Sequence, residues 1–189
     1  LILFSACSRE DKTSRTDDPR YLHQGIKQIT DRIVHDIFSP PVASRIYAYV
    51  SVAAYEAARH SDSTLQSLGG QLNGLGEAPQ PEAGKVYAWD LASVQATLVT
   101  AKAFIFSETE LVEFHEKLLK DYRKGGIDDD VYDRSIAYGN QVAQYILDWS
   151  GKDNYKQTRS FPKYSIQQSE SSWKPTPPAY MDAIEPHWS

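Results

Sequence analysis

The chain has 189 residues, of which 41% are hydrophobic and 24% are charged, and its formal net charge is −5. This composition excludes an intrinsically disordered chain, because enough apolar side chains are present to form a core. The acidic balance also argues against general nucleic-acid binding, which needs a basic surface. The length suits one domain or one part of a larger protein.

The sequence starts at Leu1, and its only methionine is Met181. At the other end, an aromatic and proline-containing segment stops at Ser189 without a terminating feature. We therefore expect this sequence to be a fragment that is open at both ends.

Residues 1–7 form a short apolar run that ends in two small residues and the only cysteine, Cys7. A single cysteine excludes a disulfide framework and a zinc site made of cysteines. The run resembles the end of a bacterial lipoprotein signal peptide, which is cut before a cysteine that is then acylated. This resemblance implies an exported protein anchored in a membrane by lipid at Cys7, and Ser8 favours the outer membrane. An ordinary secretory signal and a core strand are the alternatives, and the charges in residues 9–20 disfavour the strand.

Charged residues of both signs dominate residues 8–20, which we predict to be a flexible tether. A helix should follow, with Asp18 as its N-cap and Pro19 at its first position. Ser-Pro-Pro at residues 39–41 should end it, because the residue before a proline avoids helical geometry. Apolar residues recur three or four positions apart and predict one buried stripe. They are Leu22, Ile26, Ile29, Ile33 and Ile37.

The second predicted helix covers residues 41–60 and is apolar on nearly every side. Such a helix is typical of the centre of a bundle. Glycines and prolines then predict a long loop over residues 61–84.

Three further helices are predicted, at residues 85–106, from Ser107 to Gly125, and after residues 128–130. Ser107 and Glu110 match a capping box, in which each residue caps the start of the helix. Apolar residues in the third and fifth helices alternate four and three positions apart, as in packed antiparallel bundles. No hairpin dipeptide separates two segments of alternating apolar and polar residues. The predicted fold class is therefore all-α, with a bundle of about five helices over residues 21–150.

From residue 151 the sequence is rich in proline and in aromatic residues, and a disordered tail would be poor in aromatic residues. We predict that residues 151–189 form an ordered, irregular strap that lies across another surface and leads into a missing catalytic half. Its aromatic residues are Tyr155, Phe161, Tyr164, Trp173, Tyr180 and Trp188.

Two acid–histidine pairs stand four residues apart, Asp31 with His35 and Glu56 with His60. Each pair shares a helix face, and the two helices are consecutive, so one hypothesis is a metal site within the bundle. The alternative is a solvated pair on the first helix and a structural histidine at the end of the second. This alternative is favoured, because the Glu-x-x-His spacing of di-iron bundles is absent. The predicted site therefore contains no metal.

Glu56 lies in an otherwise apolar helix, and a buried carboxylate needs a charged or hydrogen-bonding partner. We expect Arg59 to lie off its helix face, and Asp90 and Lys102, from elsewhere in the bundle, are the candidate partners of Glu56. A structural ion pair is favoured over a catalytic role. His187, in the strap, is either a core histidine or a residue near an active site.

The stretch at residues 39–58 resembles an early helix of vanadium-dependent haloperoxidases, in the type 2 phosphatidic acid phosphatase superfamily. The pattern of that helix is R-x-x-A-x-x-x-x-A-x-Y-D/E-A. A second resemblance lies at residues 173–188, which are similar to the segment that leads into the second helical half of exported members. The matching residues of the first stretch are Arg45, Ala48, Ala53, Tyr55, Glu56 and Ala57.

The resemblance implies chemistry in an oxyanion cage that holds phosphate or vanadate. In that family the cage depends on a Lys with a following Arg-Pro, a Pro-Ser-Gly-His run, and a Ser-Arg with a distal His and Asp. Arg-Pro and Pro-Ser-Gly-His do not occur in this sequence, and Ser14-Arg15 and Ser44-Arg45 lack the spaced histidine. No catalytic residue is therefore assigned, and the fragment alone is expected to be inactive.

Two functions follow from these observations. The first is the N-terminal helical region of an exported haloperoxidase-like or acid phosphatase-like enzyme. Vanadate would then be a cofactor of the full-length protein only, and the partners would be the C-terminal catalytic half and a membrane. The alternative is a non-catalytic helical lipoprotein that binds a partner or ligand through its aromatic strap. Neither function involves nucleic acid.

Overall fold

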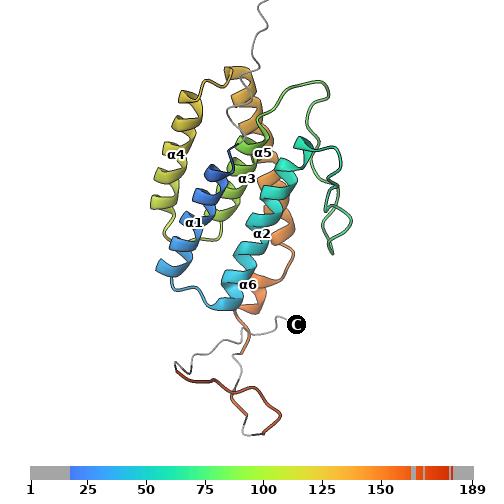
Figure 1. The fold of residues 1–189 in the computed structure, drawn as a ribbon. Helices are drawn as coiled ribbons and strands as arrows, with labels where there is room; N and C mark the ends of the chain where they lie inside the picture. The colour runs from blue at the N-terminus through green and yellow to red at the C-terminus, as the bar shows by residue number, and fades with distance from the viewer. Residues whose placement is uncertain (1–17, 163–164, 168, 179, 181–189) are drawn as a thin grey trace, which may run out of the picture.

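The computed structural model describes residues 18–162, 165–167, 169–178 and 180, and within these every regular element is a helix. Figure 1 shows the longer helices lying side by side as a bundle, with the described part of the strap hanging from one end. The predicted all-α fold is confirmed. Cys7, Tyr164, His187 and Trp188 lie outside the described residues.

Helix α1 (Pro19–His35) starts as predicted, because a carboxylate oxygen of Asp18 accepts the N–H of Arg20 at 3.0 Å. It ends in a Schellman motif, in which the N–H of Phe38 donates to the carbonyl of Ile33 at 3.2 Å. Ile37 occupies the left-handed position of this motif, with φ +55°. The prediction that Ile37 belongs to the buried apolar stripe was wrong, since its side chain is 83% exposed.

Helix α2 (Pro40–Ala58) runs back antiparallel to α1 and continues into the 3₁₀ turn η2 (Arg59–Ser61). The long loop from residue 62 to 88 then passes over the outside of the bundle (Figure 1). Tyr145, on α5 (Asp129–Ser150), donates to the carbonyl of Gly76 at 2.7 Å, and Trp149 donates to that of Asn73 at 3.0 Å. The loop is therefore fixed to the bundle by side chains of α5.

Helix α3 (Trp89–Lys102) is the central helix, in contact with α1, α2, α4 (Glu108–Lys124) and α5. The prediction that gave this place to the second helix was wrong. Several polar residues of α3 are buried. Their burial costs less free energy where their hydroxyl groups donate hydrogen bonds to backbone carbonyls. Ser93, for example, donates to the carbonyl of Ala54 at 2.9 Å.

Tertiary contacts make α3 shorter than the predicted residues 85–106. The N–H of Ala88 donates to the hydroxyl of Ser135 at 2.9 Å, and Arg134 donates to the carbonyl of Val86 at 2.9 Å. Because these backbone groups already have hydrogen-bond partners on α5, the chain before Trp89 does not become helical and α3 starts at Trp89.

The predicted capping box at the start of α4 is absent, since the side chain of Ser107 makes no capping bond. Instead, Asp36 at the end of α1 accepts the N–H groups of Phe106 at 2.8 Å and of Ser107 at 3.1 Å. A carboxylate from a distant part of the sequence thus caps α4 and ties the two helix ends together.

Helix α5 packs against α3 at Gly139, where a Cβ atom would lie 2.7 Å from the carbonyl oxygen of Ala92. The short helix α6 (Tyr155–Thr158) follows, and the rest of the described strap is irregular. Among the described residues, no helix is long and apolar enough to cross a membrane.

Candidate functional site

Arg45 and Asp153 form the most heavily bonded polar centre at the strap end of the bundle. Arg45 lies on α2, and Asp153 lies in the turn after α5. The Nε of Arg45 donates to Oδ2 of Asp153 at 2.6 Å, and the hydroxyl of Tyr49 donates to the same oxygen at 2.8 Å. The other carboxylate oxygen accepts the N–H of Tyr155 at 2.9 Å. One carboxylate thus connects α2, the end of α5 and the start of α6.

Three aromatic rings surround the guanidinium of Arg45. The Cζ atom of Arg45 lies 4.2 Å from the ring centre of Tyr155, 4.9 Å from that of Phe104 and 5.0 Å from that of Tyr49. Cation–π attraction of this kind is stronger where water is excluded. The positive charge of Arg45 is therefore already satisfied by rings and by one carboxylate.

The protonation states at this centre are fixed near neutral pH. Burial raises the pKa of Asp153, but the bonds that it accepts from Arg45, Tyr155 and Tyr49 outweigh this effect, so its pKa lies below the ordinary 3.8. Burial, together with the bond to Asp153, raises the pKa of the Tyr49 hydroxyl well above 10. The centre therefore contains a carboxylate and a neutral phenol, and neither is set to exchange protons at pH 7.

Two hollows open on either side of Arg45 and Asp153. The first, called here the Trp149 hollow, has a volume of about 700 Å³ and is also lined by Tyr49, Trp149 and Phe161. The second, the Phe104 hollow, has a volume of about 510 Å³ and lies towards Phe104 and Phe106. Both volumes are in the range that accepts a small ligand or the side chains of a packed element.

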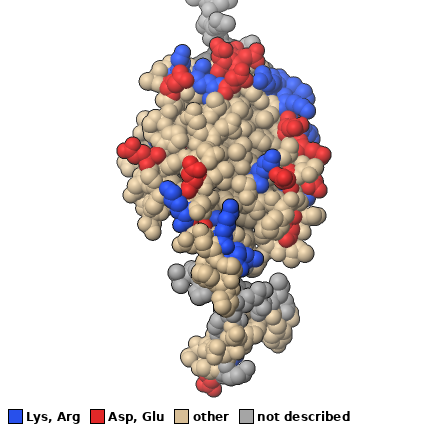
Figure 2. Space-filling model, turned by 180° about the vertical axis from the view of Figure 1, so that it is seen from behind, with Lys and Arg blue, Asp and Glu red and all other residues tan. Residues whose placement is uncertain are grey.

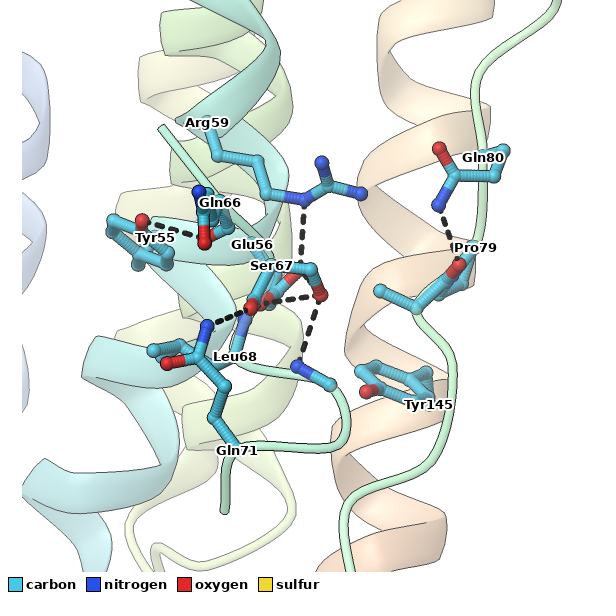
Figure 3. A network of polar contacts seen from close by, with 12 residues as sticks. Tyr55, Glu56, Arg59, Gln66, Ser67, Leu68, Gln71, Pro79, Gln80 and Tyr145 are labelled. Atoms are coloured by element: carbon cyan, nitrogen blue, oxygen red, sulfur yellow. Dashed lines mark hydrogen bonds and ion pairs between the residues drawn. The ribbon is translucent and has the colours of Figure 1, made fainter. Parts of the chain in front are cut away.

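Glu56 is fully buried and is the centre of a second polar network (Figure 3). One of its oxygens accepts from Nε of Arg59 at 2.9 Å, and the other accepts the N–H of Leu68 at 2.5 Å. The hydroxyl of Ser67 donates to the same carboxylate at 3.1 Å. The expectation that Arg59 lies off the face of Glu56 was wrong, because residues three apart are neighbours on a helix. The favoured structural ion pair is present, and it holds the long loop against α2.

The two acid–histidine pairs do not come together. Asp31 bonds to Lys27 at 2.6 Å, and His35 bonds to its neighbour Asp36 at 3.2 Å. His35 ends α1 and His60 follows α2, so the two histidines lie at opposite ends of antiparallel helices. The described residues contain no group of three metal-ligating side chains. The geometry thus gives the metal hypothesis no support.

His60 lies in an aromatic setting instead. Its ring centre is 5.4 Å from that of Trp89 and 5.9 Å from that of Tyr138. Burial and the nearby Arg59 lower its pKa, so the ring is neutral at pH 7. Of the other candidate partners, Lys102 pairs with Glu108 at 3.7 Å. Burial, together with the nearby Asp90, raises the pKa of the Tyr122 hydroxyl.

The polar residues that carry the haloperoxidase resemblance hold other segments against α2. Arg45 holds Asp153, Tyr55 donates to the carbonyl of Gln66 at 2.7 Å, and Glu56 holds the loop at residues 67–68. Sequence reasoning missed Asp153 and Asp36, the two carboxylates that join distant segments. Asp153 stands just after the fifth predicted helix, whereas Asp36 lay within the first predicted helix and had no local signal.

The described residues do not fit a vanadate ion. An oxyanion of high charge needs several cationic groups and N–H donors that are free to converge on it. Arg45 is committed to Asp153, and the unbonded Nη2 of Arg59 lies beside the buried carboxylate of Glu56, which would repel an anion. The described residues therefore line two hollows and form no oxyanion cage.

A solved structure, described as the first bacterial vanadium-dependent iodoperoxidase, is similar to this chain, with 44% sequence identity and a TM-score of 0.78. The alignment covers 90% of this chain and 41% of that chain, so the chain spans less than half the length of the protein that it matches. Neither a protein-family model nor a curated protein matches the chain. The likeness supports the resemblance to vanadium-dependent haloperoxidases that residues 39–58 indicated.

Proposed function

We propose that this chain is the N-terminal helical part of an exported, vanadium-dependent haloperoxidase-like enzyme of the type 2 phosphatidic acid phosphatase superfamily. The observation that carries the proposal is the 44% identity to a bacterial vanadium-dependent iodoperoxidase over 90% of this chain. The activity in that protein's description favours halide oxidation over phosphoester hydrolysis. The match to only 41% of that protein agrees with a part that lacks the catalytic motifs.

In this proposal the chain acts as a scaffold. The tethers at Arg45 and Glu56 keep α2 joined to the strap and to the long loop, so that both ends of the bundle have a defined shape. A rigid scaffold is needed because an oxyanion cage works only when its donors are held in place before the reaction. Vanadate would be held by residues beyond this sequence, and we assign no catalytic step to the residues described above.

The test starts with the coding sequence that follows Ser189 in the gene. The proposal expects an Arg-Pro and a Pro-Ser-Gly-His run within the next domain-sized stretch of about 200 residues. A stop codon at that point would contradict the proposal and would favour the alternative, a helical lipoprotein that binds a partner through its strap. The activity of the encoded protein, with and without vanadate, is the second test.

We further propose that Cys7 is acylated and anchors the protein to the outer membrane. The support is the sequence of residues 1–7 alone. Labelled palmitate should be incorporated into the protein expressed from its gene and not into its Cys7→Ala variant. Membrane partition of the variant equal to that of the wild type would contradict the anchor.

A further inference from the structure

Asn73 and Gly74 form an Asn-Gly pair in the long loop, outside both hollows and outside the Glu56 network. We propose that Asn73 is a modification site, where the backbone nitrogen of Gly74 displaces the side-chain amide in a deamidation that Trp149 promotes. This inference goes beyond the proposed function and does not rest on it.

The reaction needs only the peptide group between the two residues, a base and water. The base removes the N–H proton of Gly74, and the nitrogen attacks Cγ of Asn73. A new C–N bond closes a succinimide ring, while the bond to the side-chain nitrogen breaks and ammonia leaves. Water then opens the ring at either carbonyl and gives aspartate or isoaspartate. One water is consumed and one ammonia is released, and nothing is oxidised or reduced.

The reacting groups are accessible in the folded chain. Asn73 and Gly74 are both exposed, so water and base reach them. Among the described residues, neither the side-chain amide of Asn73 nor the N–H of Gly74 has a hydrogen-bond partner. Gly74 has φ +72°, which glycine adopts at low cost, and apart from its chain neighbours the nearest atom to a Cβ there would be Nε1 of Trp149, at 3.8 Å. The attacking nitrogen is therefore open to its target.

Trp149 gives the structural reason to expect the reaction at this loop. Its Nε1 donates to the carbonyl of Asn73 at 3.0 Å, and this carbonyl belongs to the same peptide group as the N–H of Gly74. Loss of the N–H proton spreads negative charge over the nitrogen and this oxygen. A donor that already points at the oxygen stabilises the anion, as the donors of an oxyanion hole do. The hydrogen bond that ties the loop to α5 therefore also promotes the attack.

The charges of the loop leave this role to Trp149. Residues 61–84 contain no Lys or Arg, and their charged residues are all acidic. Figure 2 shows the molecule from behind, where a large area in the middle of the surface is also free of charged side chains. The loop thus supplies no cation to stabilise the anion, and the N–H of Trp149 is the donor that the structure places on the Asn73 carbonyl.

Deamidation changes the loop at its contact with α5. Either product adds a negative charge at residue 73, in a loop whose charged residues are already acidic. Isoaspartate also carries the main chain through the former side chain, which lengthens the backbone by one methylene. Because Trp149 lines the Trp149 hollow, the change lies beside the wall of that hollow.

The test is incubation of the 189-residue chain at neutral pH, followed by mass spectrometry. Trypsin, used at mildly acidic pH to suppress further reaction, releases residues 60–85, in which Asn73 is the only asparagine. Deamidation adds about 1 Da, and fragment ions assign this gain to residue 73. We expect the folded chain to react at least as fast as a free peptide of residues 68–78. Slower reaction in the folded chain than in the peptide would overturn the proposal.

Two matched variants separate the effect of the hydrogen bond from that of a loosened loop. Trp149→Phe removes the donor to Asn73, whereas Tyr145→Phe removes a neighbouring donor on α5, to the carbonyl of Gly76. We expect Trp149→Phe to slow the reaction at least about fivefold and Tyr145→Phe to change it less than about twofold. Equal effects of the two variants, or a faster reaction in Trp149→Phe, would overturn the role of Trp149. The comparison of the chain with the free peptide needs no variant and tests the site even where a variant fails to fold.

Discussion

The carboxylate of Asp153 lies 2.6 Å from Nε of Arg45, and this pair joins the first half of α2 to the turn after α5. The two residues are 108 positions apart in the sequence, and no single helix contains both of them. Because Asp153 also holds the start of α6 through the N–H of Tyr155, the pair fixes where the strap leaves the bundle. The same pair separates the Trp149 hollow from the Phe104 hollow.

Asp153→Asn should weaken this junction in a pH-dependent way. The folded pKa of Asp153 lies below 3.8, so its contribution to the free energy of unfolding is present above that pH and is lost as the pH falls through the folded pKa. At pH 7 the variant should lose about 2 kcal/mol, the value of a charge-assisted hydrogen bond. As the pH falls through the folded pKa of Asp153, the difference should shrink towards zero. Urea unfolding at a series of pH values measures this.

The matched control for that experiment is Asp148→Asn, on the exposed side of α5, where the carboxylate accepts only from Gln144 at 2.8 Å. It should change the free energy of unfolding by less than about 0.5 kcal/mol. Equal losses in the two variants would show that the junction at Asp153 has no special role.

Glu56→Gln should be strongly destabilising, because it leaves the buried guanidinium of Arg59 without a counter-charge. Removing one partner of a buried pair costs about 3–5 kcal/mol, and the remaining amide oxygen should keep the loss near the lower value. Asp31→Asn is the control, since its pair with Lys27 is exposed and is worth about 0.5 kcal/mol or less. Thermal unfolding followed by circular dichroism measures both. A wild-type melting temperature for Glu56→Gln would refute the structural role of the network.

Gly139→Ala should destabilise the bundle by about 1–3 kcal/mol, because the new Cβ would lie 2.7 Å from the backbone oxygen of Ala92. Gly25→Ala is the matched control on α1, where the nearest atom to a Cβ is a carbon of Leu98 at 3.6 Å. That substitution should stabilise the chain by about 0.5–1 kcal/mol, as expected within a helix. Urea midpoints that move in the same direction for both variants would contradict the close packing of α3 and α5.

Ile37→Asn should raise the free energy of unfolding of the 189-residue chain by about 1 kcal/mol, since asparagine tolerates the left-handed conformation. Val34→Asn makes the same change of polarity at a neighbouring exposed position with helical geometry. There the lower helix propensity of asparagine should reduce stability by a few tenths of a kcal/mol. A loss of stability in Ile37→Asn would show that Ile37 is not strained in this conformation.

The sequence predicted the elements whose signals are local. Pro19 after Asp18 marked the start of α1. The apolar residues spaced four and three positions apart correctly predicted α3 and α5. It did not predict that α3 starts at Trp89, because bonds from Ala88 and Val86 to α5 decide this point. The central position of α3 was missed for a similar reason. Ser93 and Thr97 are polar, and the sequence does not show that their hydroxyl groups donate to backbone carbonyls inside the bundle.

The candidate site was predictable only in part. Arg45 and Glu56 stood out in the sequence, the first through the family resemblance and the second through its apolar surroundings. Their partners did not, since Asp153 lies more than a hundred residues from Arg45 and Ser67 lies in a loop without periodicity. The two acid–histidine pairs do not converge, because consecutive antiparallel helices place Asp31 and Glu56 towards opposite ends of the bundle.

The central proposal is that this chain supports an oxyanion site that its described residues do not form. The most direct measurement is vanadate-dependent oxidation of iodide by peroxide, with the 189-residue chain and the protein encoded by its gene assayed at equal concentration. We predict no turnover above the protein-free rate for the chain and vanadate-dependent turnover for the longer protein. Turnover by the chain alone, or none by the longer protein, would contradict the account.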